Sequence, residues 1–255
     1  MSSVKWEFFT CKNTKSDDKP NEDYASFDQE LTVGMLLDGV SRDKEEGKYP
    51  VPSPSAIATK IFADSILESS KNYSNIGLGE LQDIISCANK EVQIYNGQLK
   101  HRFPAGTVGI VFCINKRMLH YAYIGDSYAA IIRGNNRRVF TECQTAEVIK
   151  HKREYTSDEI RFGICNHVHS CGYGVWDGNP DAMDYVKYGS IKLSKGDVIF
   201  LYSDGLADEV VTKSNDELTQ SLVSELFTCT PEKGNDDRTC LKISVNCGGS
   251  RCFRL

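Results

Sequence analysis

The stretch LYSDGLADEV, residues 201–210, changes abruptly from apolar to acidic. It continues the apolar run VIFLY (198–202) and places Asp204 and Asp208 four residues apart. The pattern recurs in MLLDGV (35–40), where a second apolar run ends in Asp38 and Gly39. Such apolar runs are typical of buried strands, and strand ends are where a rigid scaffold presents side chains to a cleft. The two stretches therefore predict a site built from carboxylates at strand ends.

The composition narrows the class of protein. The 255 residues suffice for one large domain or two small ones with a hydrophobic core. A net charge of −5 gives no general attraction to nucleic acid or to an anionic membrane. The N-terminal residues do not form a signal peptide, and no apolar run approaches the length of a membrane span. We therefore expect a cytoplasmic protein with neither nucleic acid nor membrane as a partner.

Ten cysteines occur, and none of them forms a Cys-x-x-Cys pair. A zinc site of the usual spacing is therefore not predicted, and we expect reduced thiols that pack as small hydrophobic side chains. Cys247 and Cys252 lie in a Gly- and Cys-containing tail, 246–255, which we predict to follow a single domain at 1–245. We interpret the tail as a disordered end, with a redox pair or a docking segment as alternatives.

The order of the expected elements indicates the fold class. Strand patterns and helical spacings follow one another in blocks: strands at 4–10 and 31–39, helices at 53–70 and 78–97, strands from 107 to 141, a short helix at 156–163, strands within 189–205, a helix at 215–229 and a strand at 237–245. Because the helices are grouped instead of alternating with every strand, we predict an α+β fold. In it, antiparallel sheets are covered by helices, and a doubly wound parallel sheet is not expected.

Turn residues predict how the strands connect. Asn115-Lys116 predicts a two-residue hairpin turn, and the residues 134–136 predict that the strands up to 141 continue as a meander. Residues 189–205 predict a further hairpin, whose second strand leads into Asp204.

Carboxylates collect where the expected strands end or bend. The positions are Glu22-Asp23, Asp38, Asp126, Asp204 with Asp208, and Asp236-Asp237. Carboxylate and carbonyl oxygens are the ligands that hard cations prefer, so this set suits Mg²⁺ or Mn²⁺ better than zinc. Any single Asp-Gly pair is more often an ordinary turn. Five positions together, three of them directly beside apolar runs, favour a metal site.

Six short motifs then occur in a familiar order: KPNEDY (19–24), LLDGV (36–40), AGTVG (105–109), IGDS (124–127), SDGLAD (203–208) and DDRT (236–239). In this series the chain resembles the metal-dependent protein phosphatases, the PPM or type 2C serine/threonine class, and most of all their short bacterial forms. The resemblance spans about residues 5–245. It implies an αββα sandwich, in which two antiparallel sheets pack face to face and helices lie outside.

The resemblance also implies a reaction. Asp38 would bridge two Mn²⁺ or Mg²⁺ ions, the Gly39 carbonyl would bind the second ion, and Asp204 and Asp236 would complete the shell of the first. The two ions would share a hydroxide that attacks phosphoserine or phosphothreonine directly, without a covalent intermediate, and would neutralise charge on the phosphoryl oxygens. None of the ten cysteines lies in a thiol-phosphatase signature, which agrees with such a mechanism.

Further matching positions receive supporting roles by the same resemblance. Glu22 would be one of the catalytic residues and would hold a metal-bound water, and Asp23 would support it. Asp126 and Asp208 match positions that bind a weaker third ion. Gly106-Thr107 matches a structural turn before the central strand.

One departure concerns the substrate phosphate. Members of the family often carry an arginine four residues before the glutamate at position 22, and Asp18 stands there in this chain. Lys19 and Arg42 are the candidates to supply the cation, although a lysine lacks the two-pronged geometry of an arginine. Each of them taken alone is more simply a solvated loop charge. No core metal position is lost, so an active enzyme is favoured.

Two other functions stay open. The first is a catalytically silent scaffold of the same fold that binds phosphoproteins or a kinase, and the second is a hydrolase of small phosphate esters. The expected partners are a phosphorylated protein and a cognate serine/threonine kinase. Substrate selection is assigned to a variable flap at 163–188, where Trp176 is expected to pack near the cleft. We interpret His167 and His169, and the basic stretch 150–154, as solvated or satisfied groups.

Overall fold

The computed structural model describes residues 4–13, 19–40, 48–100, 102–220 and 236–245. The strands and helices of this part of the chain are β1 (Val4–Cys11), β2 (Tyr24–Asp28), β3 (Val33–Gly39), α1 (Pro54–Ser70), α2 (Leu78–Asn96), β4 (Thr107–Asn115), β5 (Met118–Ile124), β6 (Tyr128–Arg133), β7 (Asn136–Val139), α3 (Ala146–Lys150), α4 (Ser157–Glu159), β8 (Lys187–Lys192), β9 (Val198–Tyr202), α5 (Ala207–Thr212), α6 (Asn215–Thr219) and β10 (Arg238–Val245).

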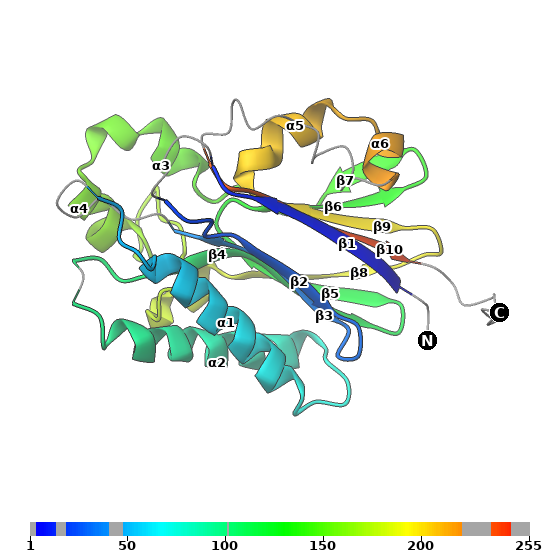
Figure 1. The fold of residues 1–255 in the computed structure, drawn as a ribbon, viewed down its shortest axis with the longest axis horizontal. Coiled ribbons are helices and arrows are strands. Elements are labelled where there is room, and N and C mark those ends of the chain that lie inside the picture. Colours follow the sequence, from blue (N-terminus) through cyan, green and yellow to red (C-terminus); the bar gives the residue numbers. More distant parts are fainter. Residues whose placement is uncertain (1–3, 14–18, 41–47, 101, 221–235, 246–255) are drawn as a thin grey trace.

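Two five-stranded antiparallel sheets form the centre of the molecule. Their strand orders are β1-β10-β9-β6-β7 and β2-β3-β4-β5-β8. The helices α1 and α2 cover the outer face of the second sheet, and α5 and α6 lie over the first (Figure 1). The predicted α+β class and the αββα sandwich are therefore confirmed.

The apolar runs are continuous because both faces of the central strands are covered. In β3, Leu36 packs between the sheets, whereas Met35 and Leu37 pack against α1 and α2. In β9, Leu201 also lies between the sheets, while Phe200 lies on the outer side, under α5 and α6. A strand that is buried on both faces loses the polar alternation of a half-exposed strand. This burial explains the apolar character of MLLDGV and VIFLY.

Two of the predicted strand connections are wrong. The residues 189–205 do not form a hairpin, because β8 pairs with β5 in one sheet and β9 pairs with β6 and β10 in the other. The meander also breaks, since β5 and β6 lie in different sheets. In both places the chain crosses the sandwich, which strand periodicity cannot distinguish from a turn within one sheet.

Other element predictions fare better, with small shifts. The first hairpin turn consists of Lys116 and Arg117, one residue later than predicted, because Asn115 still pairs with Met118. The helices at 53–70 and 78–97 are confirmed as α1 and α2. The predicted helix at 215–229 begins as α6, and its continuation from 221 lies outside the described residues. The proposed tail at 246–255 lies outside them as well.

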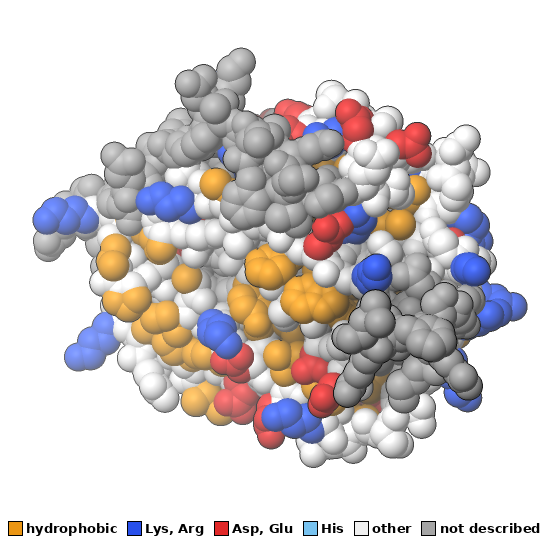
Figure 2. All heavy atoms as spheres, turned by 45° about the vertical axis from the view of Figure 1, so that its right-hand side comes forward, with side chains coloured by type: hydrophobic (Ala, Val, Ile, Leu, Met, Phe, Trp, Pro, Cys, Tyr) orange, Lys and Arg blue, Asp and Glu red, His pale blue; other side chains and the backbone are white. Residues whose placement is uncertain are grey.

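The face of Figure 2 carries exposed hydrophobic groups among acidic and basic ones. Trp6 and Phe8 on β1 are 39% and 42% exposed, and their rings stack at 6.0 Å. Of the helices in the described ranges, none combines the length and the apolar character needed to cross a membrane.

Candidate metal and phosphate site

Asp38 lies at the mouth of the space between the two sheets. Side chains alternate along a strand, so Asp38 shares the inward face of β3 with Leu36, which is buried in the inter-sheet core. Its carbonyl oxygen accepts a hydrogen bond from the Thr107 hydroxyl at 2.9 Å. The strand that buries Leu36 thus carries a carboxylate to the same end of the sandwich as α3 and α4 (Figure 1).

Other carboxylates meet Asp38 at this end. Asp204 comes shortly after β9, with Ser203 between them, and Asp126 lies between β5 and β6. Burial raises the pKa of Asp38 well above its usual value, and the charges of Asp23, Asp204, Asp126 and Asp236 raise it further. Asp38 therefore interacts with four acidic side chains that come from other segments of the chain.

The neighbours of Asp38 are perturbed in the same direction. Burial raises the pKa of Asp23 to about 7, opposed by hydrogen bonds from Thr239 and Ser203. Partial burial raises the pKa of Asp204 to about 7 as well, followed by the charges of Asp126 and Asp236. The pKa of Asp126 is raised by burial, against a hydrogen bond of 2.9 Å that its Oδ2 accepts from Thr145. Each of these three carboxyls resists ionisation mainly because it is buried, and neighbouring negative charges add to the effect.

The Glu22 carboxylate, unlike the aspartates above, is held in place by two hydroxyl groups. Its side chain is 1% exposed, and its Oε1 accepts hydrogen bonds from the hydroxyls of Tyr49, at 2.7 Å, and Ser53. Ser53 is also the N-cap of α1, since its hydroxyl accepts from the Ala56 amide. The start of α1 therefore fixes the orientation of Glu22. Sequence reasoning missed both Tyr49 and Ser53; the Ser-Pro pair at the start of the expected helix is the signal that could have identified Ser53 as an N-cap.

Asp237 links the segment before β10 to two residues near the start of the described chain, Asn13 and Glu22. Its Oδ1 accepts from the backbone and the side-chain amide of Asn13, and its Oδ2 accepts from the Glu22 amide at 2.9 Å. Asp237 is 2% exposed, and its own amide donates to Asp236 at 2.9 Å. This residue positions Glu22 and Asp236, a structural role that its place beside Asp236 did not reveal.

Lys19 lies among these acids. Its ammonium is 3.4 Å from Glu22 and Asp236 and 3.6 Å from Asp237, and its side chain is 11% exposed. Burial would lower the pKa of Lys19, but these three negative charges raise it above its usual value. Lys19 is thus a cation within the site and not a solvated loop charge. Arg42, the other phosphate candidate, lies outside the described residues, as does Asp18.

The remaining residues singled out from the sequence are either exposed to solvent or fully buried. Asp208 is exposed on α5, and it is not among the main charges that act on Asp38. His167 and His169 are both exposed, as expected for groups without a metal role. Trp176 is fully buried, stacks on Phe62 at 4.5 Å and exchanges backbone hydrogen bonds with Thr107. Trp176 therefore packs beside Thr107, whose hydroxyl donates to the Asp38 carbonyl.

Glycines let the segments of the site approach one another. A Cβ at position 39 would lie 2.8 Å from the Glu22 Cβ, and one at 205 would lie 2.1 Å from the Asp237 carbonyl oxygen. Neither position has a left-handed backbone. The Gly of each Asp-Gly pair is therefore required for close packing between the motifs, and not for the turn that the sequence suggested.

The donor set fits divalent cations. Hard oxygen ligands predominate, their carboxylates repel one another, and Asp23 Oδ1 is buried without a hydrogen-bond partner in the described part of the chain. Within that same part, no three acidic, histidine or cysteine side chains converge closely enough to hold one ion by themselves. Mg²⁺ and similar ions keep several water ligands, so this spacing is compatible with ions bound by one or two carboxylates each.

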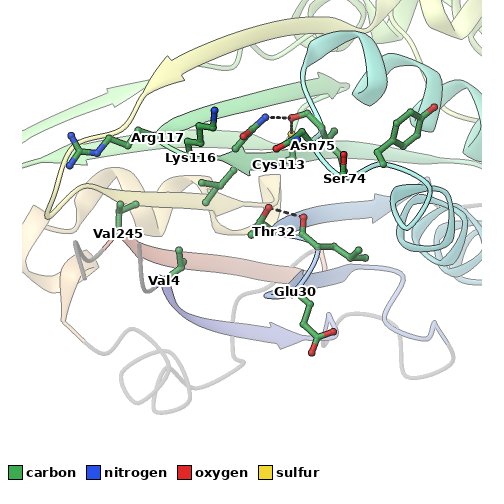
Figure 3. Close-up of a pocket in the computed structure, with 14 residues that line it drawn as sticks. Val4, Glu30, Thr32, Ser74, Asn75, Cys113, Lys116, Arg117 and Val245 are labelled. Carbon is green, nitrogen blue, oxygen red and sulfur yellow. Dashed lines mark hydrogen bonds between the residues drawn. The ribbon is translucent and has the colours of Figure 1, made fainter. Parts of the chain in front are cut away.

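A separate pocket of about 530 Å³ lies at the opposite end of the sandwich (Figure 3). It is lined by Thr32, which precedes β3, and by Lys116, which follows β4, whereas Asp38 lies at the far end of β3. Both Thr32 and Lys116 have left-handed backbones, with φ of 55° and 56°. Charge, and not cavity volume, therefore marks the candidate site.

Comparison with known proteins bears on the fold. No protein-family model matches the sequence, and no curated protein matches it significantly. The serine/threonine phosphatase PstP/Ppp of Mycobacterium tuberculosis matches with a TM-score of 0.71 and 16% identity over 95% of this chain and 99% of that one. The catalytic domain of PstP in complex with two manganese ions matches with a TM-score of 0.68 and 15% identity, covering 95% and 98% of the two chains.

A third match is the PPM Ser-Thr phosphatase MsPP from Mycobacterium smegmatis, in complex with cacodylate. Its TM-score is 0.61 at 16% identity, over 96% of this chain and all of that one. The chain therefore has the PPM phosphatase fold that the motifs implied. Identities this low establish the fold and leave the activity to be argued from the site.

Proposed function

We propose that this chain is a metal-dependent protein serine/threonine phosphatase of the PPM family. The observation that carries the proposal is the meeting of Asp38 with Asp23, Asp126, Asp204 and Asp236 at one end of the sandwich. That arrangement occurs in a fold shared with a phosphatase that binds two manganese ions. Carboxylates that repel one another in this way are stabilised when cations bind among them.

Each residue has a proposed task. Asp38, Asp204, Asp236 and the Gly39 carbonyl would hold two Mn²⁺ or Mg²⁺ ions, and Asp126 and Asp208 would hold a third. Once bound, the ions would supply a water of lowered pKa and neutralise the phosphoryl oxygens. The fixed carboxylate of Glu22 would orient water in that shell, and Asp23 would accept from Ser203 at 3.0 Å behind it.

The substrate would be phosphoserine or phosphothreonine in a protein, so a serine/threonine kinase belongs to the same system. Lys19 and Arg42 are the proposed phosphate-binding cations. Because Lys19 is already paired with Glu22 and Asp236, we propose that it also limits repulsion within the metal-free site.

The first experiment measures hydrolysis of para-nitrophenyl phosphate by the purified chain after chelation, and again after Mn²⁺ or Mg²⁺ is restored. Asp38→Asn and Asp204→Asn serve as site variants, with Asp83→Asn on the exposed face of α2 as the control. We expect activity that returns only with metal and is lost by at least 100-fold in the two site variants. Folded protein without activity at any metal concentration would favour the silent scaffold.

A second comparison separates protein from small-ester substrates. A phosphothreonine peptide and para-nitrophenyl phosphate compete for the same metal-loaded protein. A higher kcat/KM for the peptide supports a protein phosphatase, because a larger substrate makes contacts beyond the phosphate. A lower value favours the small-ester hydrolase.

A further inference from the structure

A pocket of about 280 Å³ lies directly beside the carboxylates, between the residue that follows β3 and the segment that carries α3 and α4. Val40 and Thr145 both line it. Val40 comes next to Gly39 in the chain, and the Thr145 hydroxyl donates to Asp126 at 2.9 Å. The pocket therefore borders the candidate site, with Thr145 in contact with both.

The walls of the pocket are mainly apolar. Val148 and Ile149 come from α3, Ile160 follows α4, and the Tyr173 ring closes another side. Ile149 is 59% exposed, an unusual position for a large apolar side chain beside a charged site. The volume is just below that of pockets that hold whole ligands, about 300–1,000 Å³. It suits one large side chain of a larger substrate.

Two cationic side chains, Lys152 and Arg161, also line the pocket. Two acids on the same segment already have cationic partners, because Glu147 pairs with Lys150 and Asp158 pairs with Arg102. Lys152 is exposed and forms no ion pair with any residue in the described ranges. A substrate that carries phosphate, and acidic residues near it, would therefore be attracted to this edge of the site.

We propose that this pocket binds a bulky apolar side chain, such as leucine or phenylalanine, that lies within about three residues of the phosphorylated residue in the protein substrate. The inference rests on the proposed function and narrows its substrate class. It also places substrate selection in residues 145–161 together with Tyr173, in addition to the flap at 163–188. Binding there requires an extended phosphopeptide whose phosphate lies at the carboxylates while its anchor side chain enters the pocket.

The test uses phosphothreonine peptides in a uniform background of alanine and serine. One leucine is placed in turn at each of three positions on either side of the phosphothreonine. Both kcat/KM with Mn²⁺ and affinity by fluorescence anisotropy are measured with the full chain. The anisotropy measurement reports on the pocket even for a protein that hydrolyses nothing, so failure of the proposed function and failure of the pocket are separable.

Ile149→Asn is the pocket variant, and Ile94→Asn is its matched control, because Ile94 is a similarly exposed isoleucine, at 56%, on α2. We expect leucine at one position to improve kcat/KM or affinity about tenfold over alanine, which corresponds to about 1.4 kcal/mol. Ile149→Asn should reduce that preference to less than about threefold, and Ile94→Asn should retain it.

Hydrolysis of para-nitrophenyl phosphate should change less than twofold in both variants, since this ester does not reach the pocket. Lys152→Gln should weaken binding of the leucine peptide most strongly at low salt, because an exposed charge is screened as ionic strength rises. Equal binding of all leucine and alanine peptides would overturn the proposal. So would a leucine preference that Ile149→Asn and Ile94→Asn leave equally intact.

Discussion

Neutralising Asp38 should stabilise the metal-free protein. The Asp38 carboxyl is held by burial and by four neighbouring acids at a pKa well above its usual value. Asp23, one of these neighbours, has its own pKa raised to about 7. A carboxyl whose pKa is raised in the folded protein opposes folding once the pH exceeds its usual pKa, by about 1.4 kcal/mol for each pKa unit of the shift.

The expected gain from Asp38→Asn is smaller than the full cost of the raised pKa. An asparagine amide at the same place still loses hydration, so we expect a net increase of about 2 kcal/mol in the free energy of unfolding. For a chain of this size this corresponds to a rise in Tm of about 4–8 °C. The raised pKa also sets the pH dependence. The folded protein binds protons more tightly than the unfolded chain, so the gain is absent near pH 4 and grows as pH rises toward 7.

Thermal and urea unfolding at pH 4, 6 and 8, after chelation, measure this effect. Asp83→Asn on the exposed face of α2 is the control and should change stability by less than about 0.5 kcal/mol. Added Mn²⁺ should then reverse the order, because wild-type protein gains stability by binding ions and Asp38→Asn does not. Equal stability of Asp38→Asn and wild type at pH 8, or a gain that is the same at pH 4 and 8, would refute the mutual repulsion of these carboxylates.

Other contacts at the carboxylate end give three further expected outcomes. Gly205→Ala places a Cβ against the Asp237 carbonyl and should lower the free energy of unfolding in urea by about 1–3 kcal/mol. Gly163→Ala, whose Cβ would meet no atom within 4 Å, should lower it by less than about 1 kcal/mol. Similar losses of stability in the two variants would contradict the close packing at position 205. Lys19→Met leaves the buried Glu22 without its cation and should lower the free energy of unfolding of the metal-free protein by about 3 kcal/mol. An unchanged free energy of unfolding would show that the Lys19 ion pairs contribute little to stability. Two of the carboxyls, Asp23 and Asp204, have a pKa of about 7. Mn²⁺ binding should therefore release protons at pH 6, and the affinity should rise at least tenfold by pH 8. Calorimetry in buffers of different ionisation enthalpy measures the proton release, and binding without it would contradict the raised pKa values.

The fold was predictable where a signal is local. Long apolar runs marked strands covered on both faces, helical spacing located α1 and α2, and the segregation of helices indicated α+β. Allocation of strands to sheets was not predictable. β8 and β9 follow each other closely in the chain, yet they belong to opposite sheets. A strand with two buried faces can pair in either sheet, so its periodicity carries no information about its neighbours.

The candidate site, like the fold, could be predicted from the sequence only in part. The sequence by itself determined that Asp38 and Asp204 follow buried strands, because hydrophobic runs and the polar residues that end them are properties of neighbouring positions. Only the tertiary structure decided that these two acids meet Asp23 and Asp126, that Tyr49 and Ser53 orient Glu22, and that Lys19 lies among three carboxylates. Some of those contacts join residues 217 positions apart in the chain, and they depend on which strands pair and how closely the sheets pack. Long-range packing of this kind buries these carboxyls and sets the distances between their charges, and both effects raise the pKa values that mark the site.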